Sequence, residues 1–277
     1  MRKIAVLVCF LLILPVFVCA QNFSGRRQNK IPIAEPEKSL KIGERLEYSL
    51  EWLGVPVGTI TLHVEEIRNI EGHDCYYVTA HAMPNKYLAK LYDVEYTVHT
   101  YIDTKHIYTR RFEKIRRMKD QYNYVTIDFD RENKRVEYRS EGSAPLFDIS
   151  EGHRDEAGQE IPRTLEVING TQDLFSSIYY LRLLELKKNH SYNIEIYYDQ
   201  KNWPLTMRVG EPFMMDIRHQ GTFAVFKTTM DSELGKFILG KSKMTVYFTA
   251  DSRRIPVEFK FWTGLGYIRG IISDRSD

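Results

Sequence analysis

The residue types that carry out chemistry are spread thinly along this chain of 277 residues. The sequence has no glycine-rich phosphate loop, no Gly-x-Ser-x-Gly turn around a serine nucleophile and no Cys-x-x-Cys pair. Its histidines lack the close, ordered spacing that places two imidazoles on one zinc ion; they are His63, His73, His81, His99, His106, His153, His190 and His219. The sequence therefore predicts no catalytic residue, no metal site and no cofactor.

A run of positive charge between residues 110 and 119 is the densest local feature. Its cations are interleaved with bulky apolar side chains and with a single acid, Glu113. Such a surface fits lipid phosphates or an acidic partner. Exposed charges on a long hairpin also keep a sheet edge from pairing with another sheet, and we favour this structural interpretation. The cations are Arg110, Arg111, Lys114, Arg116, Arg117 and Lys119.

Aromatic residues are the second signal, because Phe, Trp and Tyr make up 13% of the chain. Tyr and Trp suit surfaces with one apolar and one wet side, so they can line a ligand groove, although an ordinary β core uses them more often. We expect such a groove to be lined by Trp52, Tyr96, Tyr179, Tyr180, Arg182 and Trp203.

The first 20 residues predict export. A positively charged start precedes an almost unbroken apolar run, which ends in a short Val-Cys-Ala triplet at residues 18–20. A retained anchor is disfavoured because the run falls short of the roughly 20 apolar residues of a spanning helix and contains Pro15. A lipoprotein signal would modify Cys19, but Val18 stands where that site prefers a small residue. We expect cleavage, no stable transmembrane segment afterwards, and a periplasmic protein of a Gram-negative bacterium.

Cleavage would leave a body without net charge. The full chain has 39 Lys and Arg against 37 Asp and Glu, and the signal contains Arg2 and Lys3 but no acid. Equal numbers of cations and acids argue against nucleic acid as a partner, since phosphate binding needs a basic surplus. Cys75 would remain as the one cysteine, which excludes an intramolecular disulfide and fits a small apolar residue of a strand.

The elements that must position these side chains are mostly strands. Leu46, Tyr48 and Leu50 alternate with polar residues, and the chain then turns at 54–58. Similar segments recur about every 8–12 residues, which is typical of a sandwich or barrel. The pattern predicts a mainly β, antiparallel half-barrel or nearly closed barrel of about a dozen strands.

Only one segment has a clear helical period. Leu174, Ile178 and Leu181 fall on one face, so the sequence predicts an amphipathic helix over 172–186 that packs on the concave side of the sheet. A single helical turn over 85–91 is also compatible with the pattern.

The expected organisation is a signal peptide at 1–20, an extended N-terminal arm at 21–41 and a single β domain at 42–277. Residues 140–163 are polar and contain several glycines without any period, which predicts a long central loop.

Several segments, in this order, carry a family resemblance: 43–48 with 52–58, 173–182, and 251–257 with 264–268. They resemble the opening, the central segment and the closing hairpin of the bacterial exported proteins grouped as domain of unknown function 3108. The resemblance spans about residues 42–273 and implies export but no established activity, so it assigns no catalytic residue. The closing pattern is also similar to half-barrel periplasmic lipoprotein carriers, which is a similarity of fold and not of function.

Three functions remain open at this point. The leading hypothesis is a non-enzymatic periplasmic protein that binds a lipid, an acyl chain or another amphipathic envelope ligand, because a curved sheet rich in aromatic residues lacks a catalytic set. The second is an envelope assembly or scaffold protein that meets another envelope protein through a surface patch. The third is a cell-wall or polysaccharide hydrolase, which would need two facing acids with perturbed pKa values.

Overall fold

The computed structural model describes residues 35, 37–90, 93–119, 121–142, 165–166, 170–198, 201–233, 243–263 and 266–276. The expected signal peptide lies outside these residues, as do most of the expected arm and all of the expected central loop except 140–142. The strands are β1 Arg45–Trp52, β2 Val55–Ile70, β3 His73–Pro84, β4 Val94–Asp103, β5 Thr109–Met118, β6 Gln121–Asp130, β7 Arg135–Gly142, β8 Leu165–Glu166, β9 Ser191–Tyr198, β10 Lys201–Ile217, β11 Gly221–Ser232, β12 Lys243–Thr249, β13 Pro256–Thr263 and β14 Gly266–Ser276.

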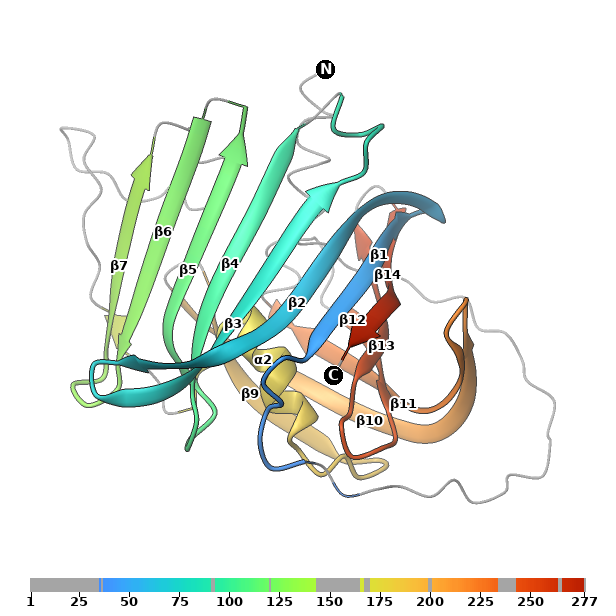
Figure 1. Ribbon diagram of the computed structural model, residues 1–277. Coiled ribbons are helices and arrows are strands. Elements are labelled where there is room, and N and C mark those ends of the chain that lie inside the picture. Colours follow the sequence, from blue (N-terminus) through green and yellow to red (C-terminus); the bar gives the residue numbers. More distant parts are fainter. Residues whose placement is uncertain are drawn as a thin grey trace.

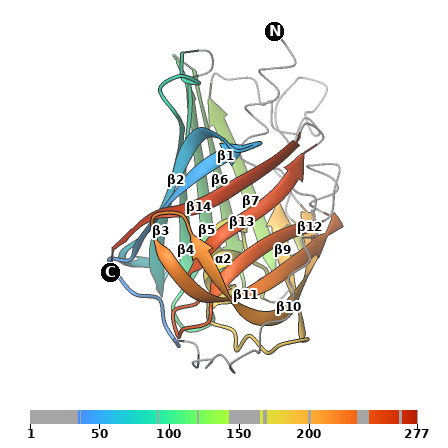
Figure 2. The same ribbon diagram turned by 90° about the vertical axis from the view of Figure 1, so that its right-hand side faces the viewer.

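These fourteen strands form one antiparallel sheet in the order β8-β7-β6-β5-β4-β3-β2-β1-β14-β13-β12-β11-β10-β9. The first and last long strands, β1 and β14, pair in its middle, so β8 and β9 are its outer edges. The sheet curls between its N-terminal and C-terminal halves (Figure 1), and β10 to β14 cross in front of the N-terminal strands in the turned view (Figure 2). The mainly β half-barrel predicted from the sequence is confirmed.

The chain that joins the two edges contains the helix α2, Leu174–Arg182. A connection between opposite edges of one curved sheet has to cross one of its faces, and α2 crosses the concave face. No helix in the described part of the chain has the length and the apolar character needed to cross a bilayer.

The helix is shorter than the segment 172–186 predicted from its period. Leu183 and Leu184 donate backbone hydrogen bonds to residues only three positions earlier, which tightens and ends the last turn. Leu181 and Leu186 are both buried in one apolar cluster. On a continued helix they would lie about 140° apart, so the chain must leave the helix to bury both.

The first hairpin turn is also tighter than predicted. Leu53 and Gly54 both have positive φ angles, of 51° and 84°, and Val55 already belongs to β2. Positive φ at two consecutive positions is typical of the two-residue turn that matches the twist of paired strands. The segment expected to turn at 54–58 is therefore mostly strand.

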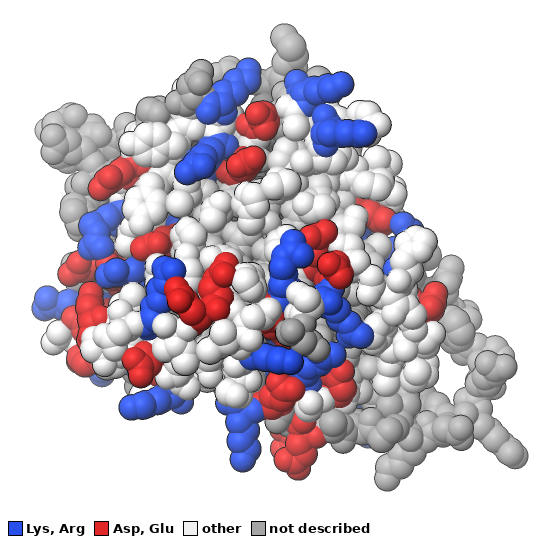
Figure 3. Space-filling model, in the orientation of Figure 1, with Lys and Arg blue, Asp and Glu red and all other residues white. Residues whose placement is uncertain are grey.

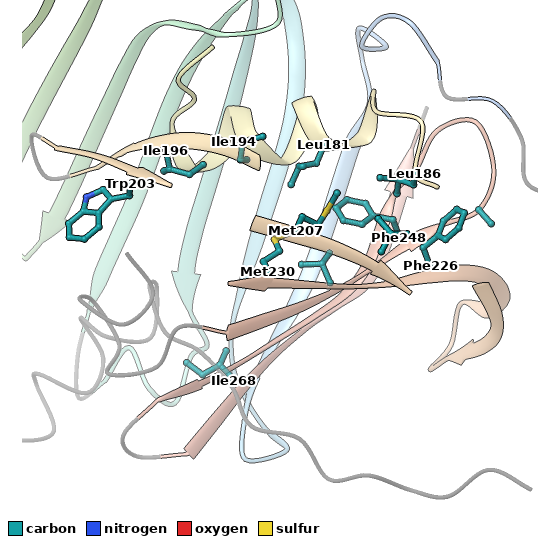
Figure 4. Packing of buried hydrophobic residues seen from close by; sticks show 13 residues of the cluster. Leu181, Leu186, Ile194, Ile196, Trp203, Met207, Phe226, Met230, Phe248 and Ile268 are labelled. Atoms are coloured by element: carbon teal, nitrogen blue, oxygen red, sulfur yellow. The ribbon is translucent and has the colours of Figure 1, made fainter. Parts of the chain in front are cut away.

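Three apolar clusters meet on α2. Leu181 packs against β9 to β12, and Figure 4 shows Leu181 and Leu186 directed toward Met207 and Phe226. Phe175 and Ile178 contact the cluster around β1 and β14, and Tyr179 contacts a cluster of β2, β3 and β4 residues. The helix therefore fills the space between the two halves of the sheet at one end.

A buried ion pair fixes the C-terminal end of the helix. The Arg182 guanidinium donates two hydrogen bonds of 2.6 Å to the Glu44 carboxylate, and its Nε donates to the Arg253 carbonyl at 3.1 Å. Arg182 is 5% exposed and Glu44 is 2% exposed. Burial opposes the charge of Arg182, but the hydrogen bonds from Arg182 to Glu44 outweigh it and raise the pKa of the guanidinium.

We predict that Arg182→Met lowers the free energy of unfolding by about 3–5 kcal/mol, because it leaves the Glu44 carboxylate buried without its cation. The double variant Glu44→Gln, Arg182→Met should regain most of that loss, since no charge remains buried. Arg45→Met is the control: its side chain is 41% exposed and pairs with Glu47 at the surface, so it should cost under about 1 kcal/mol. Urea unfolding of the three variants checks this; equal losses for Arg182→Met and Arg45→Met would contradict it.

Candidate functional site

One end of the concave face is occupied by a buried polar network at the start of α2. Asp173 caps the helix by accepting from the backbone N–H groups of Phe175 and Ser176. Its other carboxylate oxygen accepts from the Thr100 and Thr109 hydroxyls at 2.5 and 2.8 Å. Asp173, Ser176 and the two threonines are buried and hydrogen-bonded, so the network joins α2 firmly to β4 and β5.

The segment before α2 spans the gap between the two sheet edges. Gln172 exchanges backbone hydrogen bonds with Glu195 and Tyr197 of β9, and its side-chain amide donates to the Ile107 carbonyl. On the other side, Arg131 donates to the backbone carbonyls of Thr109 and Thr171. Burial lowers the pKa of Arg131 to about 10. At this end, main-chain and guanidinium contacts therefore join β9 to the connections of the N-terminal strands.

The opposite end of the concave face is lined differently. The inward-facing side chains there come from the ends of β1, β4, β9, β10, β12 and β13. We call this surface the distal inner face; it consists of Trp52, Tyr96, Tyr198, Trp203, Leu205, Met244 and Phe261. All of these side chains except Trp203 are only half-buried, which distinguishes them from the fully packed residues around α2.

Two cations of β5 face the same side of the sheet. Tyr96 is the cross-strand partner of Arg116, and Arg116 is in turn opposite Asn123 of β6. Lys114 lies two residues earlier on the same face. Arg116 is 5% exposed and Lys114 is half-buried. On the distal inner face, the aromatic side chain of Tyr96 therefore lies next to a positively charged strip on β5.

The structure brings together some of the side chains expected to line a groove. Trp52, Tyr180 and Trp203 all pack against one apolar cluster. Trp203 donates from Nε1 to the Tyr198 carbonyl, and Lys201 lies 4.1 Å from the Trp203 ring centroid. Tyr96 lies on the neighbouring strip beside Arg116.

Tyr179 and Arg182 lie elsewhere, on the buried side of α2 that faces β2 to β4 and Glu44. Burial raises the pKa of Tyr179 above the ordinary tyrosine range. Both residues lie in the same helix as Tyr180 but on its buried side. The residues that they contact, such as Glu44, lie far away in the sequence, so no local sequence pattern predicts these contacts.

The basic run of residues 110–119 is distributed over two faces of β5. β5 pairs with β4 and β6, so it is an inner strand and cannot protect an edge. Lys114 and Arg116 point to the concave face, whereas Arg111 and Arg117 alternate with them on the outer face. The patch predicted from the sequence is therefore not one continuous surface.

Two of these cations are held in ion pairs of the outer face. Arg110 contacts Asp103 at 3.1 Å and Glu132 at 3.0 Å, and Arg111 contacts Asp128. Burial opposes ionisation of Asp103, but hydrogen bonds from two backbone N–H groups and from Arg110 outweigh it and hold its pKa below the usual range. These contacts connect neighbouring strands and give the residues a structural role.

Two buried acids of the described part of the chain are bridged by an arginine. Glu51 and Glu258 are 2% and 0% exposed, and Arg269 contacts both, at 3.8 and 2.5 Å. Arg218 and Lys260 add a further contact to Glu51 and Glu258, respectively. Cations that contact both carboxylates favour the charged form of each, as in a structural ion-pair network. A hydrolase with two acids would need one carboxyl group to stay protonated.

Cys75 is fully buried at the start of β3. Burial raises the pKa of its thiol to about 12, and Asp103 adds to the shift. A thiol of this kind is protonated at neutral pH and inert, because the thiolate is the reactive form.

Comparison with known proteins gives a family and a fold. The model of a family described as "Protein of unknown function (DUF3108)" matches residues 47–270. No curated protein matches the chain. The structure is similar to that of a β-barrel-like protein of domain of unknown function DUF1849 from Brucella abortus, with 11% sequence identity and a TM-score of 0.52 over 85% of this chain and 97% of the other.

Two further structures align over most of the chain but with low scores. A provisionally assigned lipoprotein from Parabacteroides distasonis has 7% identity and a TM-score of 0.30, covering 90% of this chain and 100% of its own. A provisionally assigned exported protein with a YmcC-like fold from Bacteroides fragilis has 7% identity and a TM-score of 0.31, covering 88% and 99%. The Brucella protein supports the fold alone, and the other two carry no argument.

We predict that Cys75 does not react with iodoacetamide in the folded protein at pH 8 and reacts fully after unfolding in urea, because burial keeps the thiol protonated and covered. Mass spectrometry of the peptide that contains Cys75, before and after unfolding, checks this. Rapid labelling of the folded protein would contradict an inert thiol.

Proposed function

This chain belongs to the DUF3108 family, whose function is unknown, and we therefore propose its function from the distal inner face. The protein is an exported, non-enzymatic protein that binds an amphipathic envelope ligand, with an acyl chain on the aromatic strip and an anionic head group at Lys114 and Arg116.

The observation that carries this proposal is the juxtaposition of two kinds of lining on one concave surface. Phe259 and Phe261 stack with ring centroids 5.8 Å apart and are half-buried. Ligand sites are concave and mainly apolar, with a small number of polar groups that orient the ligand. Partly exposed aromatic residues that face inward fit the chain of a lipid better than they fit a closed core.

The charge on β5 supports an anionic head group. Arg116 and Lys114 are the cations of the inward register of β5, two positions apart, and Tyr96 lies across from Arg116. A guanidinium presents planar paired donors that match a carboxylate or a phosphate, and these bonds are strong where water is partly excluded. Asn123, opposite Arg116, adds an amide beside the same position.

The compartment follows from the sequence rather than from the fold. The apolar segment with a positive start supports export, and a ligand of the cell envelope is the amphipathic molecule that an exported protein meets. The periplasm of a Gram-negative bacterium is the proposed location.

We predict that Arg116→Met weakens binding of a fluorescent anionic probe, dansylaminoundecanoic acid, by about tenfold or more, because it removes a charged hydrogen-bond donor from the head-group position. The methyl ester of the probe has no negative charge, so it should bind the unaltered protein and Arg116→Met equally. Phe261→Ala should weaken binding of the acid and the ester alike, since it shortens the apolar strip. Fluorescence titration of the folded protein measures each affinity.

The matched control for this experiment is Arg117→Met. Arg117 is the next residue of the same strand but faces the opposite side of the sheet, so its loss should leave probe affinity unchanged. A thermal melt of every variant separates loss of binding from loss of folding. Absence of probe binding by the unaltered protein, or equal losses for Arg116→Met and Arg117→Met, would reject the proposed function.

A further inference from the structure

Exposed apolar side chains gather at the end of the sheet that bears the distal inner face. In a sheet of consecutive hairpins, the connections β1/β2, β3/β4 and β5/β6 fall at one end, and α2 lies toward the other. Among the described residues, five of the nine large apolar side chains that are exposed belong to these three connections or the strand ends beside them. They are Leu53, Val55, Met83, Tyr87 and Tyr122.

The most exposed of these residues flank two connections that are joined by hydrogen bonds. Val55 is 62% exposed and Tyr87 is 68% exposed. Asn85 joins their two connections: its backbone N–H donates to the Val57 carbonyl at 2.9 Å and its side chain donates to the Pro56 carbonyl at 2.6 Å. The Asn85 side chain also accepts from the backbone N–H of Tyr87, which fixes the backbone at this position. The apolar groups are therefore presented by an ordered backbone.

Exposed cations accompany the apolar side chains. Lys86 and Lys90 lie in the β3/β4 connection, and Arg117 and Lys119 lie at the β5/β6 turn. Asp93 and Glu95 are the exposed acids among the described residues of the same three connections and the strand ends beside them, and Glu95 is the cross-strand partner of Arg117. Figure 3 shows Lys and Arg side chains at the upper end of the view, with Asp and Glu side chains between some of them. Among the described residues here, exposed cations therefore outnumber exposed acids, although the chain as a whole is nearly neutral.

We propose that these turns form a docking rim that binds the surface of an anionic lipid bilayer. The docking rim consists of Leu53, Val55, Tyr87 and Tyr122 with Lys86, Lys90, Arg117 and Lys119. The cations lie against lipid phosphates, and the tyrosine and aliphatic side chains enter the head-group layer, where amphipathic aromatic rings are favoured. An acidic protein surface would use the cations but would leave the four exposed apolar groups without a function.

The position of the docking rim explains what docking would achieve. Trp52 immediately precedes Leu53, and Leu88 immediately follows Tyr87; both pack against the cluster that includes Trp203. The docking rim therefore borders the distal inner face and would hold it against the lipid layer. In this respect the inference rests on the proposed function, while the binding of the rim to a bilayer is measurable without any ligand inside.

The test is co-sedimentation of the full folded protein with vesicles of phosphatidylcholine alone and of phosphatidylcholine mixed with phosphatidylglycerol. We expect binding to the mixed vesicles at low salt, weaker binding at high salt and little binding to the neutral vesicles. The variant Lys86→Ser, Lys90→Ser, Arg117→Ser, Lys119→Asn should lose about tenfold or more of its partition into mixed vesicles, because each cation near such a surface contributes to attraction. Asn is chosen for Lys119 because its φ angle is 52°.

A matched variant removes four exposed cations from the other end of the molecule: Lys38→Ser, Lys41→Ser, Lys187→Ser, Lys188→Ser. It has the same net charge as the rim variant and should keep its vesicle binding. Val55→Ser, Tyr87→Ser should weaken binding at high salt, where the apolar contact is the main attraction that remains. Circular dichroism and thermal melts confirm that each variant is folded.

The outcomes separate this inference from the proposed function. Arg116→Met should lose the anionic probe and keep vesicle binding, and the rim variant should keep the probe and lose vesicle binding. Equal losses for the rim variant and its matched variant would overturn the docking rim, as would absence of binding by the unaltered protein. Probe binding in that case would leave the proposed function intact.

Discussion

A single chain segment has to join the two outer edges of a fourteen-stranded sheet, and every other feature of the concave face depends on how it crosses. It crosses as α2, and a charged side chain is buried near each end of the helix. Asp173 stands at the N-terminus and Arg182 in the last turn, which matches the partial positive and negative charges of the helix ends. Hydroxyl groups of β4 and β5 satisfy Asp173, and Glu44 satisfies Arg182, so neither charge is left uncompensated.

This crossing makes the two ends of the concave face unlike. Around α2, aliphatic and aromatic side chains from both halves of the sheet are fully buried, and polar groups are hydrogen-bonded to one another. Away from α2, no helix covers the sheet in the described part of the chain, and the inward side chains of β1, β4, β10 and β13 are mostly half-buried. A helix of only nine residues covers about 14 Å of a much longer sheet. The short length of α2 therefore leaves the distal inner face outside the part of the sheet that the helix covers.

Much of this architecture is predictable from local patterns in the sequence. The alternation of Leu46, Tyr48 and Leu50 predicts a strand with one buried face, and the spacing of Leu174, Ile178 and Leu181 predicts the one amphipathic helix. In both patterns, apolar residues that face the core recur at a fixed spacing along the chain. The half-barrel follows from them because many short strands and a single helix have few other ways to bury their apolar faces.

The remaining features depend on partners that are distant in the sequence. Arg182 contacts Glu44, 138 positions away, so its burial cannot be inferred from the helix alone. The strand β10 continues through a bulge between Val209 and Pro212, although Gly210 and Pro212 make the sequence look like two strands. The basic run of β5 suggests one continuous patch for another reason. Its cations are neighbours in the sequence, but successive side chains of a strand face opposite sides of the sheet.

Because of this alternation, β5 places cations on both faces of the sheet. Lys114 and Arg116 supply charge to the concave face, while Arg117, one residue later, belongs to the exposed end of the sheet. The register of β5 is held on one side by the Arg111 contact with Asp128 of β6, and on the other by its pairing with β4. A slip of one residue would turn every one of these cations to the other face. Pairing with β4 and β6, together with the Arg111 contact to Asp128, therefore keeps Lys114 and Arg116 on the concave face and Arg117 on the outer face.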